Sequence, residues 1–122
     1  MSRISDNFFQ QDAVSLAKAL LGKILVRSYP DGFVEKFIIT ETEAYMGTED
    51  LACHASKGRT PRTETLYAEG GVLYVYLIYG MYQMLNIVSG NINHPEAVLI
   101  RSLNKTKGPG RVGKILEIDR SF

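Results

Sequence analysis

The segment ETEAY, from Glu41 to Tyr45, carries two carboxylates and an aromatic ring at alternating positions. In a β-strand Glu41, Glu43 and Tyr45 share one face, because successive side chains point to opposite faces. A carboxylate beside apolar rings tends to have a raised pKa, which suits proton abstraction near neutral pH. Glu43 is therefore a candidate general base next to a ring that could stack on a substrate. The alternative is that both glutamates are solvated residues of an edge strand.

Arg101 and His54 are two further candidates. Arg101 lies among aliphatic residues, where a guanidinium requires an anionic partner such as Glu43 or a phosphate. His54 follows Cys53 in a long polar segment that shows no clear periodicity and is therefore expected to be functional or mobile. We expect no metal site from Cys53, His54 and His94, because adjacent residues rarely both bind one ion and no second ligand pair is present.

The segment VLYVYLIYGMY, residues 72–82, contains four of the seven tyrosines and no charged residue. On a regular strand Tyr74 and Tyr76 share one face. Tyr79 and Met81 flank a glycine, so they can project from a bend, and such a pair suits insertion between stacked bases. The alternative is a core strand with an exposed tip.

Hydrophobic periodicity and turn residues predict the elements that must position these side chains. A helix is expected over 12–23, with Asp12 as its cap and Gly22 as its end, and a second short helix is entered through residues 108–110. Strands are expected at the following segments: 23–29, 33–45, the tyrosine-rich segment, 81–89 and 97–103. The first two strands should pair as a hairpin across the turn at 30–32. This order predicts an α+β fold, a mostly antiparallel curved β-sheet with peripheral helices.

Composition limits the protein class. The chain has 122 residues, 45% of them hydrophobic and 22% charged, which predicts one globular domain over residues 1–122. No apolar run approaches the roughly 20 residues of a membrane span, and no signal peptide is recognised, so a cytoplasmic location is expected. Cys53 is the only cysteine, which excludes an intrachain disulfide. The net charge is +1, but residues 101–120 carry six basic side chains against two acidic ones.

Several long motifs together resemble one enzyme family. They are ETEAYMGTEDLACH (41–54), GRTPR (58–62), LYVYLIYGMYQMLN (73–86), FFQQDAVSLAKALLGKILVR (8–27) and VLIR (98–101). In this order they closely resemble the 3-methyladenine DNA glycosylase family, the alkylpurine DNA glycosylases of the mammalian alkyladenine type. Relative to that family, the chain is expected to be shortened after Arg101 and at its C-terminus.

The resemblance implies a catalytic group and a set of base-binding side chains. Glu43 matches the glutamate that activates the attacking water, and Arg101 matches the arginine near that water and the adjacent phosphate. Tyr45, His54 and Tyr76 match the flat walls that stack on the extruded base.

The resemblance also implies roles for three residues outside those walls. Asn86 matches the residue that disfavours guanine by crowding its exocyclic amine. Tyr79 matches the tyrosine that enters the duplex where the damaged nucleotide was, and Met81 lies in the same wedge.

The implied activity is that of a monofunctional glycosylase that hydrolyses the N-glycosidic bond of alkylated purines in double-stranded DNA. It implies a monomer that needs no cofactor or metal and acts in the cytoplasm, or in the nucleus of a eukaryote. Two alternatives are a shortened, inactive relative that binds DNA weakly, and a carbohydrate enzyme or lectin that uses Glu41 and Glu43 beside tyrosine platforms.

Overall fold

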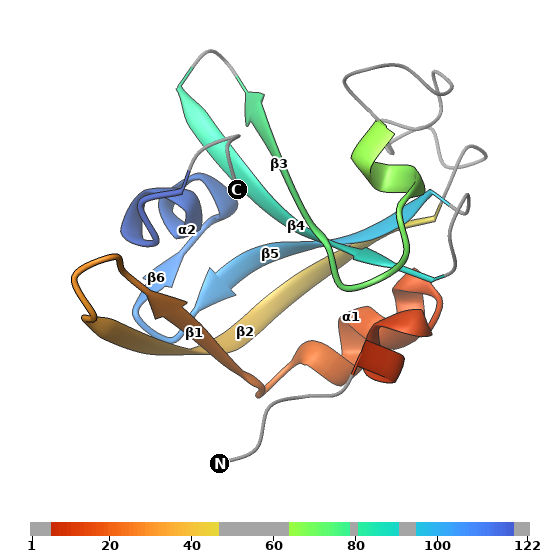
Figure 1. Cartoon of the computed structure of the whole chain (residues 1–122), viewed down its shortest axis with the longest axis horizontal. Helices are drawn as coiled ribbons and strands as arrows, with labels where there is room; N and C mark the ends of the chain where they lie inside the picture. The colour runs from red at the N-terminus through yellow and green to blue at the C-terminus, as the bar shows by residue number, and fades with distance from the viewer. Residues whose placement is uncertain (1–5, 47–63, 79–80, 91–94, 119–122) are drawn as a thin grey trace.

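The computed structural model describes residues 6–46, 64–78, 81–90 and 95–118 (Figure 1). The elements follow one another as η1 (Asp6–Gln10), α1 (Ala13–Leu20), β1 (Ile24–Ser28), β2 (Val34–Met46), η3 (Glu64–Tyr67), β3 (Leu73–Ile78), β4 (Tyr82–Ser89), β5 (Glu96–Leu103), β6 (Thr106–Lys107) and α2 (Pro109–Ile115), where η marks a short 3-10 helix. The predicted helices and strands are therefore confirmed to within a few residues. The short elements η1, η3 and β6 were not predicted from the sequence.

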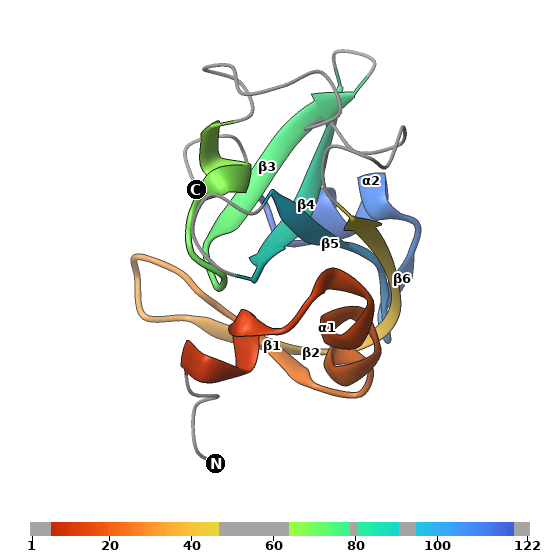
Figure 2. The same cartoon turned by 90° about the vertical axis from the view of Figure 1, so that its right-hand side faces the viewer.

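The strands form one antiparallel sheet with the order β1-β2-β5-β4-β3, and β6 pairs with β5. Figures 1 and 2 show a twisted, open sheet with α1 and α2 packed against it. This arrangement confirms the α+β prediction. No helix within the described ranges is long and apolar enough to cross a membrane.

Local chemistry explains where α1 and the first hairpin begin and end. Asp12 caps α1, since its carboxylate accepts the Ser15 backbone N–H at 2.9 Å. The chain leaves the helix through Gly22, whose φ of 85° suits glycine. In the β1–β2 turn, Gly32 has φ 92° and donates its N–H to the Tyr29 carbonyl at 2.9 Å. The predicted turn chemistry is confirmed.

Two separate clusters of buried side chains lie on the two faces of the sheet. The helix-covered core joins α1 and α2 to one face, and its members include Leu16, Leu20, Ile87, Val98, Ile100, Val112 and Leu116. The tyrosine cluster lies on the other face and consists of Leu66, Tyr67, Tyr74, Tyr76, Met84, Val88, Ala97 and Leu99, with Tyr45 packed against it. Val98 and Leu99 are adjacent in β5 and belong to different clusters, as strand alternation requires.

An irregularity in the β2–β5 pairing reverses the alternation along β2. The register shifts on both sides of Glu41. Before the shift, Phe37 and Ile39 enter the helix-covered core; after it, Ala44 packs against that core and Tyr45 against the tyrosine cluster. Had the strand stayed regular, Glu43 would have followed Ile39 into the apolar core. Bulges of this kind redirect side chains, and here the shift turns the carboxylate to the opposite face.

Candidate functional site

A row of paired residues crosses four strands of the sheet on the tyrosine-cluster face. Glu43 of β2 pairs with Leu99 of β5, Leu99 pairs with Asn86 of β4, and Asn86 pairs with Tyr74 of β3. Directly paired residues in antiparallel strands project to the same face. The sheet therefore brings together residues that lie far apart in the sequence.

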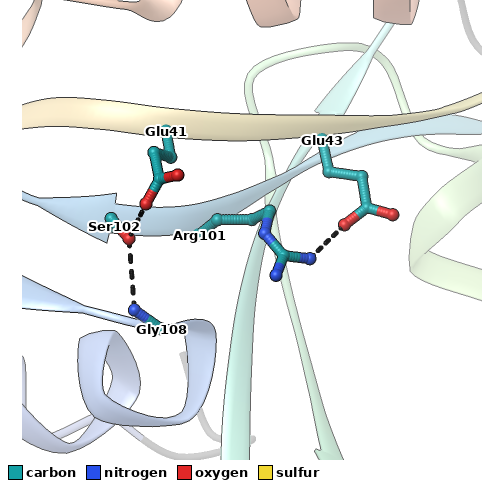
Figure 3. Close-up of polar contacts among 5 residues, drawn as sticks. All are labelled: Glu41, Glu43, Arg101, Ser102 and Gly108. Carbon is teal, nitrogen blue, oxygen red and sulfur yellow. Dashed lines mark hydrogen bonds and ion pairs between the residues drawn. The ribbon is translucent and has the colours of Figure 1, made fainter.

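Glu43 and Arg101 form an ion pair on this face (Figure 3). Arg101 Nη1 lies 2.5 Å from Glu43 Oε2, and the two side chains remain 46% and 39% exposed. The hydrogen bond to Glu43 raises the pKa of the Arg101 guanidinium above its ordinary value, so Arg101 stays charged. A pair as exposed as this contributes only about 0–1 kcal/mol to folding. Of the two partners predicted for Arg101, the carboxylate is the one observed.

Tyr45 lies next to the Glu43 carboxylate and is only partly exposed. Burial raises the pKa of the Tyr45 hydroxyl far above its ordinary value of 10, and the neighbouring Tyr76 and Glu43 raise it further. Tyr45 is therefore a neutral phenol at every physiological pH. Its hydroxyl keeps its proton and can donate a hydrogen bond to the Glu43 carboxylate.

Tyr76 and Asn86 are buried beside these polar groups. The rings of Tyr76 and Tyr74 lie 5.7 Å apart between centroids, with their planes inclined at 40°. Asn86 is 2% exposed, and its Nδ2 donates to the Met84 carbonyl at 3.4 Å. The site face thus combines an ion pair, a neutral phenol and neighbouring tyrosine rings tilted against each other.

The contacts described above include neither the residues predicted to enter the duplex nor the predicted base-stacking histidine. Tyr79 and His54 lie outside the described residues. Met81, which precedes β4, is 67% exposed. Tyr82 is also exposed at the first position of β4, and its ring lies so close to Gly110 that a Cβ there would be 2.7 Å from the tyrosine Cδ1.

Sequence reasoning missed the environment of Glu41. Its carboxylate accepts a short hydrogen bond from the Ser102 hydroxyl, which also accepts the Gly108 backbone N–H at 3.1 Å. A regular strand would direct Ser102 to the face opposite Arg101, so no pattern in the sequence indicated this contact. Among the described residues, no group of three potential metal ligands is assembled.

Comparison with known proteins identifies the family. The family model described as methylpurine-DNA glycosylase matches residues 7–108. The chain belongs to the methylpurine-DNA glycosylase family. It is 47% identical over 127 aligned residues to a Borreliella afzelii protein, covering 94% of this chain and 68% of that protein. A Legionella pneumophila protein is 46% identical, covering 98% of this chain and 68% of its own length. Both relatives are named, provisionally, as 3-methyladenine DNA glycosylases.

Membership of this family confirms the resemblance drawn from the motifs. It also favours a DNA glycosylase over the carbohydrate-binding alternative. The matched residues 7–108 contain Glu43, Tyr45, Tyr76, Asn86 and Arg101.

Proposed function

We propose that the chain is a monofunctional glycosylase that removes 3-methyladenine-type purines from double-stranded DNA and acts as a monomer. The supporting observation is the Glu43–Arg101 pair at 2.5 Å on a sheet face lined by tyrosine rings. Family membership and the relatives' names support the DNA substrate. Folding gains little from so exposed a pair, so a role in chemistry accounts for it better than a role in stability.

In the proposed reaction, the Glu43 carboxylate accepts a proton from a water molecule that attacks C1′ of the damaged nucleotide. The C1′–N9 bond breaks as the C1′–O bond forms, and the bonding pair neutralises the cationic purine, which leaves as a neutral base. The sugar acquires oxocarbenium character in the transition state, and the carboxylate stabilises that charge. Arg101 orients Glu43 and binds the neighbouring phosphate through its remaining N–H groups.

The aromatic residues would supply the energy for taking the base out of the duplex. Base flipping costs a few kcal/mol of lost stacking and pairing. Stacking on Tyr45, His54 and Tyr76 returns about 1–3 kcal/mol per base, and a cationic base strengthens each contact with an electron-rich ring. Tyr79 and Met81 would enter the gap left in the duplex.

Asn86 would set the preference among purines. Its amide is held inside the tyrosine cluster by the hydrogen bond to the Met84 carbonyl. An exocyclic amine of guanine would meet that amide, whereas adenine has no amine at the corresponding position.

The experiment is base release from a methylated duplex, with sodium borohydride in a parallel reaction to reduce any Schiff base. The proposal predicts free 3-methyladenine, an intact strand with an abasic site, and no covalent protein–DNA complex after reduction. Unmethylated duplex is the control. An inactive relative would release no base from the methylated duplex, and a borohydride-trapped complex would contradict direct attack by water.

A further inference from the structure

Ser102 lies at the meeting point of three elements that surround the site. It is the residue after Arg101 in β5, it contacts Glu41 in β2, and it contacts Gly108 at the start of α2 (Figure 3). Its side chain is buried, with 1% of the residue exposed. A serine buried in this way normally has its hydrogen-bonding capacity satisfied, and both of its bonds join separate elements.

The two hydrogen bonds of Ser102 have a fixed direction. The Gly108 backbone can only donate, so the Ser102 oxygen accepts from it. The single Ser102 proton is then available for Glu41 Oε1, which accepts it as a carboxylate. The hydrogen bonds therefore run in one direction, from the Gly108 N–H to the Ser102 oxygen and from the Ser102 O–H to the Glu41 carboxylate. Both donors of this series are used.

These hydrogen bonds lie at the register shift in which Arg101 has no partner in β2. Glu41 pairs with Ser102, whereas the next pair is Thr42 with Ile100, so Arg101 is the extra residue of β5 at this point. An extra residue in a bulge lacks a partner of its own, and its direction depends on what holds its neighbours. The pairs on either side of Arg101 are Glu41 with Ser102 and Thr42 with Ile100, and the first of them is held by the Ser102 hydrogen bonds. Arg101 itself reaches back to Glu43.

We propose that Ser102 is a positioning residue for the site: by bonding Glu41 and Gly108 it fixes the bulge in β5 and so holds the Arg101 guanidinium against Glu43. Glu41 takes part as the acceptor of this bond and not as a second base. The inference rests on the proposed function for its kinetic consequence, because it assigns a role within that same site.

The kinetic test compares Ser102→Ala with a matched control, Ser89→Ala. Ser89 is equally buried in the adjacent strand β4, and its hydroxyl has no hydrogen-bond partner among the described residues. Losing a hydrogen bond worth about 1–1.5 kcal/mol corresponds to a rate loss of about tenfold if it acts in the transition state. We expect Ser102→Ala to slow single-turnover base release by about tenfold with unchanged affinity for methylated duplex, while Ser89→Ala keeps the wild-type rate.

Changes at Glu41 test the same bond from its exposed end, where a substitution is compatible with folding. Glu41→Gln retains an oxygen that accepts the Ser102 proton, so it should keep most of the rate. Glu41→Ala should lose about tenfold, and combining it with Ser102→Ala should cause no further loss, because both remove one bond. Equal losses in Glu41→Gln and Glu41→Ala would overturn the proposal, since charge alone would then explain the effect.

A readout independent of catalysis is the ¹H–¹⁵N signal of the Arg101 Nη1 group, which donates to Glu43 Oε2. A guanidinium held against a carboxylate exchanges its protons slowly, and we expect that signal to broaden in Ser102→Ala but not in Ser89→Ala. A wild-type protein that releases no base would refute the proposed function alone. A released base with an unchanged rate and an unchanged Arg101 signal in Ser102→Ala would refute the positioning role. If Ser102→Ala does not fold, a wild-type rate in Glu41→Ala refutes it equally.

Discussion

The two faces of the sheet differ in what their side chains do. On one face, α1 and α2 cover an apolar core built from aliphatic residues. On the other face, the row of paired residues that contains Glu43 and Asn86 runs through the tyrosine cluster, beside the Glu43–Arg101 pair. Residues next to each other in β5, such as Val98 and Leu99, separate onto the two faces. One sheet thus carries a face covered by helices and a face that presents a partly exposed ion pair.

The difference shows how a small protein can present a carboxylate at its surface beside buried side chains. Glu43 stays partly exposed and paired with Arg101, whereas buried apolar side chains stabilise the fold on both faces, most of them in the helix-covered core. The register shift around Glu41 keeps Glu43 out of that core. Mutations on the two faces should therefore affect different measurements.

A cavity in the helix-covered core should have the largest effect on stability. Leu16 of α1 is fully buried, so Leu16→Ala should lower the free energy of unfolding by about 2–5 kcal/mol. Urea denaturation followed by circular dichroism measures this change. Val14→Ala, on the exposed side of the same helix, is the control and should change little. Equal losses in both variants would contradict the role of the helix-covered core in stability.

A mutation at the contact between α2 and β4 should lower the stability almost as much as the cavity at Leu16. A Cβ at Gly113 would lie 1.9 Å from the Gln83 carbonyl oxygen, which is backbone and cannot turn aside. Gly113→Ala should therefore push α2 away from the sheet and cost about 1–3 kcal/mol of stability. Lys114→Ala, at the next and exposed position, serves as the control in the same thermal melts. A melting temperature of Gly113→Ala at or above the wild-type value would show that the close approach is not needed.

The smallest effect is expected at the exposed cap of α1. Hydrogen bonds from Ser15 hold the pKa of Asp12 below its ordinary value of 3.8. The folded state therefore binds this proton less readily than the unfolded state, so the charged cap stabilises the protein above about pH 4. That contribution is lost as the pH falls through the lower, folded pKa. Asp12→Asn keeps one capping oxygen but not the charge, so its melting temperature should lie slightly below wild type at pH 7, and the difference should shrink between pH 5 and pH 2. If the melting temperatures of the two proteins fall in parallel as the pH is lowered, the Asp12 carboxylate does not contribute to the loss of stability in acid.

Much of the fold could be predicted because its signals are local. Alternating residues predicted the strands, Asp12 and Gly22 marked the first helix, and the proline–glycine turn indicated the first hairpin. A guanidinium among aliphatic residues needs an anion, so the sequence limited the partner of Arg101 to two candidates, Glu43 or a phosphate. The structure shows Glu43.

The rest depends on non-local geometry. The order of the central strands places β5 between β2 and β4, which no turn or spacing specifies. The register shift at Glu41 arises between two strands about 60 residues apart, as the contact from Ser102 to Glu41 illustrates. The short helix η3 falls in a segment without periodicity, so its contribution of Leu66 and Tyr67 to the tyrosine cluster was not foreseen.

The most direct test of the division between the two faces is one variant, Glu43→Gln, measured in two ways. Single-turnover release of 3-methyladenine from methylated duplex should fall by about 10²–10⁴-fold, since a general base typically contributes that much. The melting temperature and the affinity for the same duplex should stay at the wild-type values, because the exposed pair stabilises the fold by at most about 1 kcal/mol. A Glu43→Gln protein that releases base at the wild-type rate, or that loses activity only because it unfolds, would contradict the account.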